Sequence, residues 1–214
     1  MNHTHASGRG KYTLQWMTGT AMMIAVTLVL GATPLGLIRT PILTATTLHI
    51  PVIIATLVLG IEAGALTGLV FGVQSFVNSF SSASFFGPFF INPLVSVLPR
   101  VLFPVCVYVI ARCANRLTAG GKSVFAYIAA SALGTAAHTT MVMGMIYLLY
   151  GDKIRLMLEN QANVPEAVAS RGVGMGIAAM AVSNGVPEMI VAALIAPVVT
   201  LALDRAFGRM SIKK

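Results

Sequence analysis

Apolar residues occur along the chain in six long runs, separated by short segments that carry most of the charged positions. A helix needs about 20 apolar residues to cross the hydrocarbon core of a bilayer, and each run is close to or above that length. The fold class predicted is therefore an all-α integral membrane protein. Its six transmembrane helices are expected at about Trp16–Ala32, Leu43–Leu59, Ala63–Phe80, Pro93–Ala111, Val124–Tyr150 and Gly172–Leu203.

Composition supports this class and excludes others. With 57% hydrophobic and 9% charged residues, the chain cannot cover a soluble globule with polar surface. The net charge of +8 does not indicate nucleic acid, because Lys and Arg lie in short patches between apolar runs. Cys106 and Cys113 lack CxxC spacing and His neighbours, which favours a reduced, structural role and no metal site. The first run lacks a clear cleavage site and is expected to be a retained helix.

The basic residues predict the orientation, since cytoplasmic loops carry an excess of Lys and Arg. Nine lie on the side shared by the two termini: Arg9, Lys11, Arg112, Arg116, Lys122, Arg205, Arg209, Lys213 and Lys214. Five lie on the opposite side: Arg39, Arg100, Lys153, Arg155 and Arg171. Both termini are therefore expected in the cytoplasm. The chain divides into an N-terminal tail (1–15), a membrane domain (16–204) and a basic C-terminal tail (205–214).

The stretch NPLVSVLPR, residues 92–100, combines two prolines and an arginine at the mouth of an apolar run on the predicted outer side. Pro93 is acceptable in the first turn of a helix, whereas Pro99 costs a backbone hydrogen bond unless neighbours replace it. We therefore expect an irregular, outward-facing helix entrance here.

Small residues recur at helical spacing in two runs. Gly60, Gly64, Gly68 and Gly72 make three successive GxxxG steps, which let another backbone approach closely. This pattern indicates packing within the protein, with a wall beside a ligand as the alternative. An AxxxA step in the first run is a weaker signal for contact with a helix of another protein.

Ionisable and amide side chains within spans are costly, so each is a candidate for function. In the predicted topology the outer half contains His49, Asn78, Asn92 and Arg100, and Gln74, His138, Asn184 and Glu188 lie nearer the middle. These residues could converge on one outward-opening cavity.

Three of these candidates have structural alternatives. His49 could satisfy a carbonyl freed by Pro51. Asn184 and Glu188 share a helix face and could form a buried network. Arg100 could extend to the membrane interface.

Motifs for chemistry are missing from the sequence. The GK pair in ASGRGKYT has His5 where a phosphate-binding loop has glycine and Tyr12 where it has Ser or Thr. No GxSG-type serine, HExxH motif or aspartate constellation for phosphate transfer is found. The chain is therefore expected not to be an enzyme, and no cofactor is expected.

Three longer strings carry a resemblance to a known family: LHIPVIIATLVLGIEAGALTGLVFGVQS, FINPLVSVLPR and NGVPEMIVAALIAPVV. With the AxxxA step they resemble the substrate-binding S component of energy-coupling factor (ECF) vitamin transporters, across about Trp16 to Asp204. The strings are most similar to the pantothenate-specific type. The resemblance implies a six-helix S-component bundle in the bacterial plasma membrane that captures a vitamin at the outer face, under the loops GATPLGLIRTP and SFSSASFFGPFF.

The resemblance also implies partners. An S component of this type works with a transmembrane T component (EcfT) and two cytoplasmic ATPases (EcfA and EcfA'), and toppling of the S component driven by ATP presents the site to the cytoplasm. Ala21 and Ala25 match the docking motif of the family. A channel-like or purely interacting membrane subunit is the alternative of another class.

The residue types favour pantothenate among the vitamins. Pantothenate has one carboxylate with amide and hydroxyl groups, which suits one arginine, Arg100, among Asn, Gln and His side chains. Folate would predict more cations and aromatic residues, and riboflavin would predict ring stacking. Both stay open as alternative ligands.

Overall fold

The computed structural model describes residues 14–33, 36–39, 44–81, 86–118, 124–159 and 172–206. Six longer helices form a bundle: α1 (Leu14–Ala32), α2 (His49–Leu59), α3 (Ile61–Ser79), α5 (Leu98–Leu117), α6 (Val124–Glu159) and α8 (Val173–Ala206). Four short elements join them: β1 (Leu37–Arg39), β2 (Thr44–Thr46), η1 (Gly87–Ile91) and α4 (Pro93–Ser96). Most of both predicted tails and parts of both predicted capping loops lie outside the described residues.

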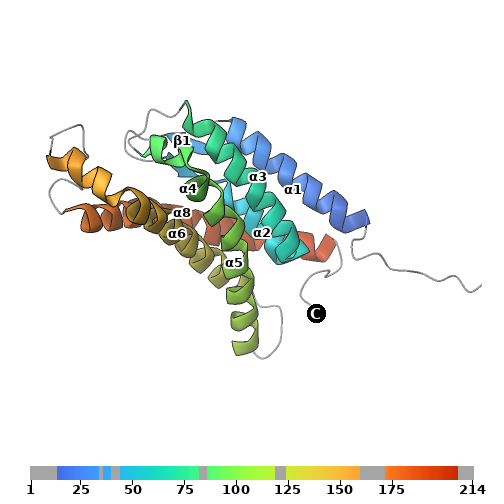
Figure 1. The fold of residues 1–214 in the computed structure, drawn as a ribbon. Coiled ribbons are helices and arrows are strands. Elements are labelled where there is room, and N and C mark those ends of the chain that lie inside the picture. Colours follow the sequence, from blue (N-terminus) through green and yellow to red (C-terminus); the bar gives the residue numbers. More distant parts are fainter. Residues whose placement is uncertain are drawn as a thin grey trace, which may run out of the picture.

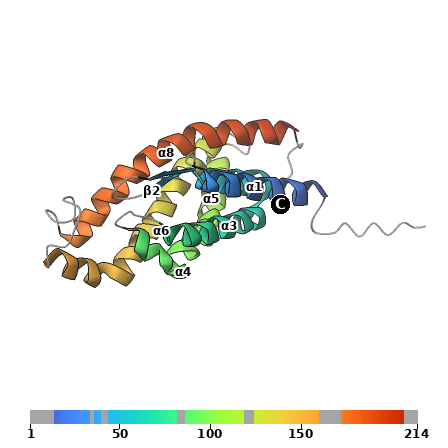
Figure 2. The same cartoon turned by 90° about the horizontal axis from the view of Figure 1, so that it is seen from above.

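Helix α2 lies at the centre of the bundle, where it packs against α1, α3, α5, α6 and α8. All 11 of its residues are buried, as expected for a helix that is apolar on every side. Figure 2 shows α8 along one side of the bundle and α3 with α4 along the other. Among the described residues, four segments are long and apolar enough to cross a membrane, namely α1, α4 with α5, α6 and α8. The bundle therefore agrees with six helices and a membrane location.

The second predicted span, Leu43–Leu59, differs from the structure. Residues Thr44–Thr46 form a strand paired antiparallel with Leu37–Arg39, and the helix begins only at His49. The β-branched threonines favour extended backbone, and Pro51 is tolerated because it falls in the first turn of α2. At about 1.5 Å per residue α2 is about 16 Å long, roughly half of a bilayer core. The all-α prediction therefore missed one β-hairpin.

The short elements gather at one end of the bundle, which we call the hairpin end (Figure 1). It comprises β1, β2, η1 and α4, and the last turns of α6 and the first turns of α8 project past it. Strand β2 contacts α8, and α4 contacts α3, α5 and α6. This end closes over the polar residues described below.

The stretch NPLVSVLPR forms the irregular helix entrance that its prolines predict. The Asn92 side chain accepts a hydrogen bond from the Leu94 backbone N–H at 3.0 Å and caps α4, with Pro93 as the first helical residue. The helix breaks at Val97, and α5 begins one residue later, so Pro99 falls in the first turn of α5. Both prolines thus occupy the first turn of a helix, where proline is tolerated.

The GxxxG glycines of α3 pack within the protein, as the first of the two alternatives predicted. A Cβ atom on Gly68 would overlap the carbonyl oxygen of Arg100, and one on Gly72 would lie 2.8 Å from the Cα of Val97. Pro104 lacks the N–H that would normally bond to this Arg100 carbonyl. The bare surface of α3 therefore lets α5, with its irregular backbone, approach closely.

Candidate ligand-binding site

Three predicted residues meet in the interior of the bundle. His49 at the start of α2, Arg100 near the start of α5 and His138 in the middle of α6 are only 1%, 3% and 3% exposed. The imidazole rings of His49 and His138 are stacked, with ring centroids 6.2 Å apart and an interplanar angle of 16°. We call these three residues the histidine–arginine cluster.

Aromatic rings line this cluster. The centroids of Phe71 and Phe103 lie 5.8 and 5.0 Å from that of His138. The guanidinium carbon of Arg100 lies 5.3 Å from the Phe71 centroid and 5.0 Å from the Phe90 centroid. These distances allow cation–π attraction, which helps to hold a buried positive charge.

Several polar nitrogens of the cluster are buried without a hydrogen-bond partner among the described residues. They are both ring nitrogens of His49, both ring nitrogens of His138 and Nε of Arg100. An unsatisfied buried polar group costs roughly 1–3 kcal/mol, and native proteins contain few of them. Five such atoms in one place make this cluster the candidate site for a polar ligand.

Arg100 is held in place by its neighbour in the sequence. Its Nη1 donates a hydrogen bond to the Val95 carbonyl at 2.6 Å. That carbonyl would normally bond to the N–H of residue 99, which proline lacks. The guanidinium therefore replaces the bond lost at Pro99, and it is buried within the bundle.

Glu188 links the hairpin end to α8. Its Oε1 accepts a hydrogen bond of 2.6 Å from the Thr46 backbone N–H of β2. Glu188 is also close enough to Arg100 for a carboxylate there to attract the guanidinium. Glu188 is thus near the cluster and holds the hairpin over it.

The structure does not support the structural alternative for His49. The carbonyl freed by Pro51 is that of Thr47, which accepts a hydrogen bond from the Ile50 N–H instead. His49 is therefore free to contact another polar group.

Comparison with known proteins identifies the family. Residues 15–200 match the family described as the substrate-specific component of ECF transporters. The chain belongs to this family. As an S component it is a transport subunit and not an enzyme, it is a multi-pass protein of the plasma membrane, and it works with an energising module. This membership decides against a channel-like or purely interacting subunit.

A named relative of this S component is a pantothenic acid transporter, PanT, of Lactococcus lactis subsp. cremoris (strain MG1363). The two chains are 28% identical over 177 residues, which cover 75% of this S component and 78% of PanT. The similarity therefore extends over most of both proteins.

Four other predicted site residues of the S component contact parts of the bundle itself. The amides of Gln74 and Asn78 in α3 donate to the carbonyls of Leu28 and Gly31 in α1, at 2.9 and 3.3 Å. Asn184 donates to the Met180 carbonyl of its own helix at 3.1 Å. The structure thus gives the amide N–H groups of Gln74, Asn78 and Asn184 backbone partners within the bundle, while Oε1 of Gln74 is buried without a hydrogen-bond partner among the described residues.

The fourth, Asn92, has contacts on two sides. Besides capping α4, its Nδ2 donates to the Tyr150 hydroxyl of α6 at 3.2 Å. The Tyr150 ring packs on Phe89 of η1, with centroids 4.9 Å apart. Asn92 therefore helps to join the hairpin end to α6.

Sequence reasoning missed the aromatic lining of the cluster. Phe71, Phe90 and Phe103 looked like ordinary apolar residues of spans and loops. One signal was available, because Phe103 follows Arg100 by three positions and so shares its helix face. The buried contact between the Tyr127 hydroxyl and the Asp204 carboxylate, which joins α6 to α8, was also missed.

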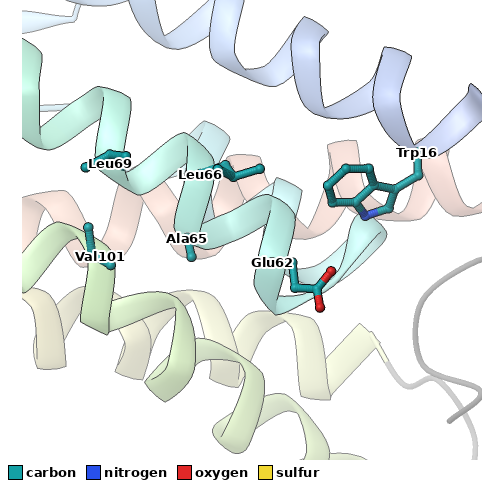
Figure 3. Close-up of a pocket in the computed structure, with 6 residues that line it drawn as sticks. All are labelled: Trp16, Glu62, Ala65, Leu66, Leu69 and Val101. Atoms are coloured by element: carbon teal, nitrogen blue, oxygen red, sulfur yellow. The ribbon is translucent and has the colours of Figure 1, made fainter. Parts of the chain in front are cut away.

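A groove of about 550 Å³ lies elsewhere on the S component (Figure 3). Its lining comes from α1, α3 and α5: Trp16, Glu62, Ala65, Leu66, Leu69 and Val101. The Trp16 indole donates a hydrogen bond to the Leu59 carbonyl at 3.0 Å. None of the predicted ligand-binding residues lines this mostly apolar groove, so we do not assign the ligand to it.

Proposed function

We propose that this S component captures pantothenate in the histidine–arginine cluster and delivers it inward. The observation that carries the proposal is the group of buried, unpartnered nitrogens on His49, Arg100 and His138. The similarity to PanT supports the choice of vitamin.

The charges around the cluster suit a ligand with a single carboxylate. The Arg100 guanidinium can pair with one carboxylate through charge-assisted hydrogen bonds. A second carboxylate would meet the nearby negative charge of Glu188, which disfavours folate. The aromatic rings already pack against His138 and Arg100, so they offer little free face for stacking a flavin.

We further propose an orientation and a set of partners. With both termini in the cytoplasm, as the basic residues predict, the hairpin end faces outward and the ligand enters there. Asn92 and Glu188, which join the hairpin end to α6 and α8, would close the site. A transmembrane T component and two ATPases would energise transport, and α1 would dock on the T component through Ala21 and Ala25, which are both exposed.

Calorimetry of the purified S component in detergent, without nucleotide, tests the substrate. Pantothenate should bind in a saturable manner with a Kd well below about 1 mM, whereas folate and riboflavin should not. Binding of another vitamin with pantothenate no tighter than about 1 mM would refute the assignment to pantothenate.

A further inference from the structure

The two imidazoles of the cluster do not satisfy each other. Their rings are nearly parallel, with an interplanar angle of 16° and centroids 6.2 Å apart, and they form no hydrogen bond with each other. All four ring nitrogens are buried and have no hydrogen-bond partner among the described residues. Arg100, in contrast, already donates one hydrogen bond to Val95.

We propose that His49 and His138 together recognise hydroxyl groups of the ligand, so that the site selects for a dihydroxylated chain and not only for a carboxylate. This inference rests on the proposed binding of pantothenate in the same cluster. It divides the site into a charged half at Arg100 and a hydroxyl-binding half at the two histidines.

The argument comes from the hydrogen-bonding capacity of an imidazole. In its neutral form the ring has one N–H donor and one acceptor nitrogen. A hydroxyl group can also donate and accept, so it can satisfy either nitrogen whichever one carries the proton. A carboxylate can only accept and would leave the acceptor nitrogen unpaired.

The described surroundings give these nitrogens no hydrogen-bond partner. Phe71 and Phe103 cover His138 and contribute no polar atoms from their side chains. Glu188 uses one oxygen to hold the Thr46 N–H. A ligand that lacks the hydroxyls would therefore leave these nitrogens unpaired in a water-poor site, and sites of this kind reject such analogues strongly.

The test compares pantothenate with its dideoxy analogue, in which hydrogen replaces both hydroxyl groups and the carboxylate and amide remain. Wild-type protein in detergent should bind the analogue at least about tenfold more weakly than pantothenate, which corresponds to the loss of one or more buried hydrogen bonds. Equal affinity of wild type for the two compounds would overturn the inference, and this measurement does not depend on any variant.

The variant His138→Phe keeps a ring among Phe71 and Phe103 but removes both nitrogens. We expect pantothenate to bind at least about tenfold more weakly, and the dideoxy analogue to bind the variant about as well as it binds wild type. Thr140→Val is the matched control on α6, because Thr140 is exposed and its hydroxyl bonds only to Ala136 of its own helix. It should change neither affinity.

The outcomes distinguish the assignment of the hydroxyl groups to the two histidines from the proposed binding of pantothenate, on which that assignment rests. If wild type binds pantothenate but His138→Phe binds it equally well, or loses affinity for both compounds alike, the hydroxyl assignment is wrong while the pantothenate proposal stands. If wild type does not bind pantothenate, both are wrong. Thermal unfolding without ligand should show that His138→Phe is no less stable than wild type, since it removes unsatisfied polar atoms.

Discussion

Arg100 combines two roles that are usually carried by different residues. Its guanidinium replaces the hydrogen bond lost at Pro99, and it places a positive charge next to His138 and two aromatic rings. Its Nε is buried without a hydrogen-bond partner among the described residues, so a ligand carboxylate should bind it firmly. The irregular backbone of NPLVSVLPR and the proposed chemistry of the site thus depend on the same side chain.

Replacing Arg100 tests the charged half of the site. Arg100→Ala should weaken pantothenate binding by at least about tenfold, because a charge-assisted contact of this kind contributes on the order of 2–5 kcal/mol. Arg100→Lys should restore part of the affinity, since the lysine ammonium keeps the positive charge but lacks the planar arrangement of N–H donors of a guanidinium. Calorimetry of each variant in detergent measures both effects.

Pantothenol, which has an alcohol in place of the carboxylate, is the control for the structural role of Arg100. It should bind wild type poorly and lose little more in Arg100→Ala. If Arg100 only supported the Val95 carbonyl, the variant would lose affinity for both compounds to the same extent. Such a result would contradict the pairing of Arg100 with the carboxylate.

At the scale of elements, helix α3 presents a glycine surface without side chains, and α4 and α5 pack against it. Gly68 and Gly72 leave room for the Arg100 carbonyl and for Val97, and Gly64 leaves room first for Thr56 of α2 and then for Pro104. The position of Arg100 along the bundle is therefore fixed partly by the absence of side chains on a neighbouring helix.

Gly68→Ala should push α5 away from α3. Its Cβ would meet backbone and not a flexible side chain, so we expect a loss of stability of about 1–3 kcal/mol. Thermal unfolding in detergent measures this loss, and pantothenate affinity should fall with it because Arg100 moves.

Gly144→Ala in α6 is the matched control. No atom lies within 4 Å of a Cβ built on Gly144, so the substitution should be neutral or should stabilise the helix by up to about 1 kcal/mol. Equal effects of the two substitutions would show that the contact between α3 and α5 does not need the glycine.

At the scale of the whole molecule, α1 presents an apolar face that the rest of the bundle leaves open. Ala21 and Ala25 are exposed, as are Met22, Val26 and Val29 beside them. On the other faces of α1, the amides of Gln74 and Asn78 tie the helix to α3. The open face is consistent with the proposed docking of a helix of the T component, where small residues allow close approach.

Ala25→Trp should block this docking without disturbing the ligand site. Because Ala25 is exposed, the larger side chain meets no neighbour within the bundle, and pantothenate affinity should stay close to that of wild type. Co-purification of the T component and the ATPases, and uptake driven by ATP, should be lost.

Leu148→Trp in α6 controls for bulk at another exposed position, since Leu148 is 79% exposed. This variant should assemble and transport as wild type does. Normal assembly of Ala25→Trp would remove the docking role from the AxxxA step.

The sequence by itself determined the class of the protein, its six helices and its packing stripe. A segment that crosses a bilayer needs a long apolar run and backbone groups that are hydrogen-bonded within the protein. The length and composition of each run reflect both requirements. The prolines and Asn92 likewise determined the irregular entrance, because capping and the missing proline N–H act within a few residues. The three strings that resemble ECF S components also indicated the family.

The tertiary structure alone decided which polar residues meet. His49, Arg100 and His138 lie on three helices far apart in the chain, and their approach depends on how each helix is rotated in the bundle. For the same reason the sequence could not predict that Gln74 and Asn78 would bind α1 instead. It also could not predict that Glu188 would contact a β-hairpin, because the apolar run 43–59 was expected to be one continuous helix. An apolar run shows that a segment is buried but not what its few polar atoms contact, because those contacts are made between segments and not along them.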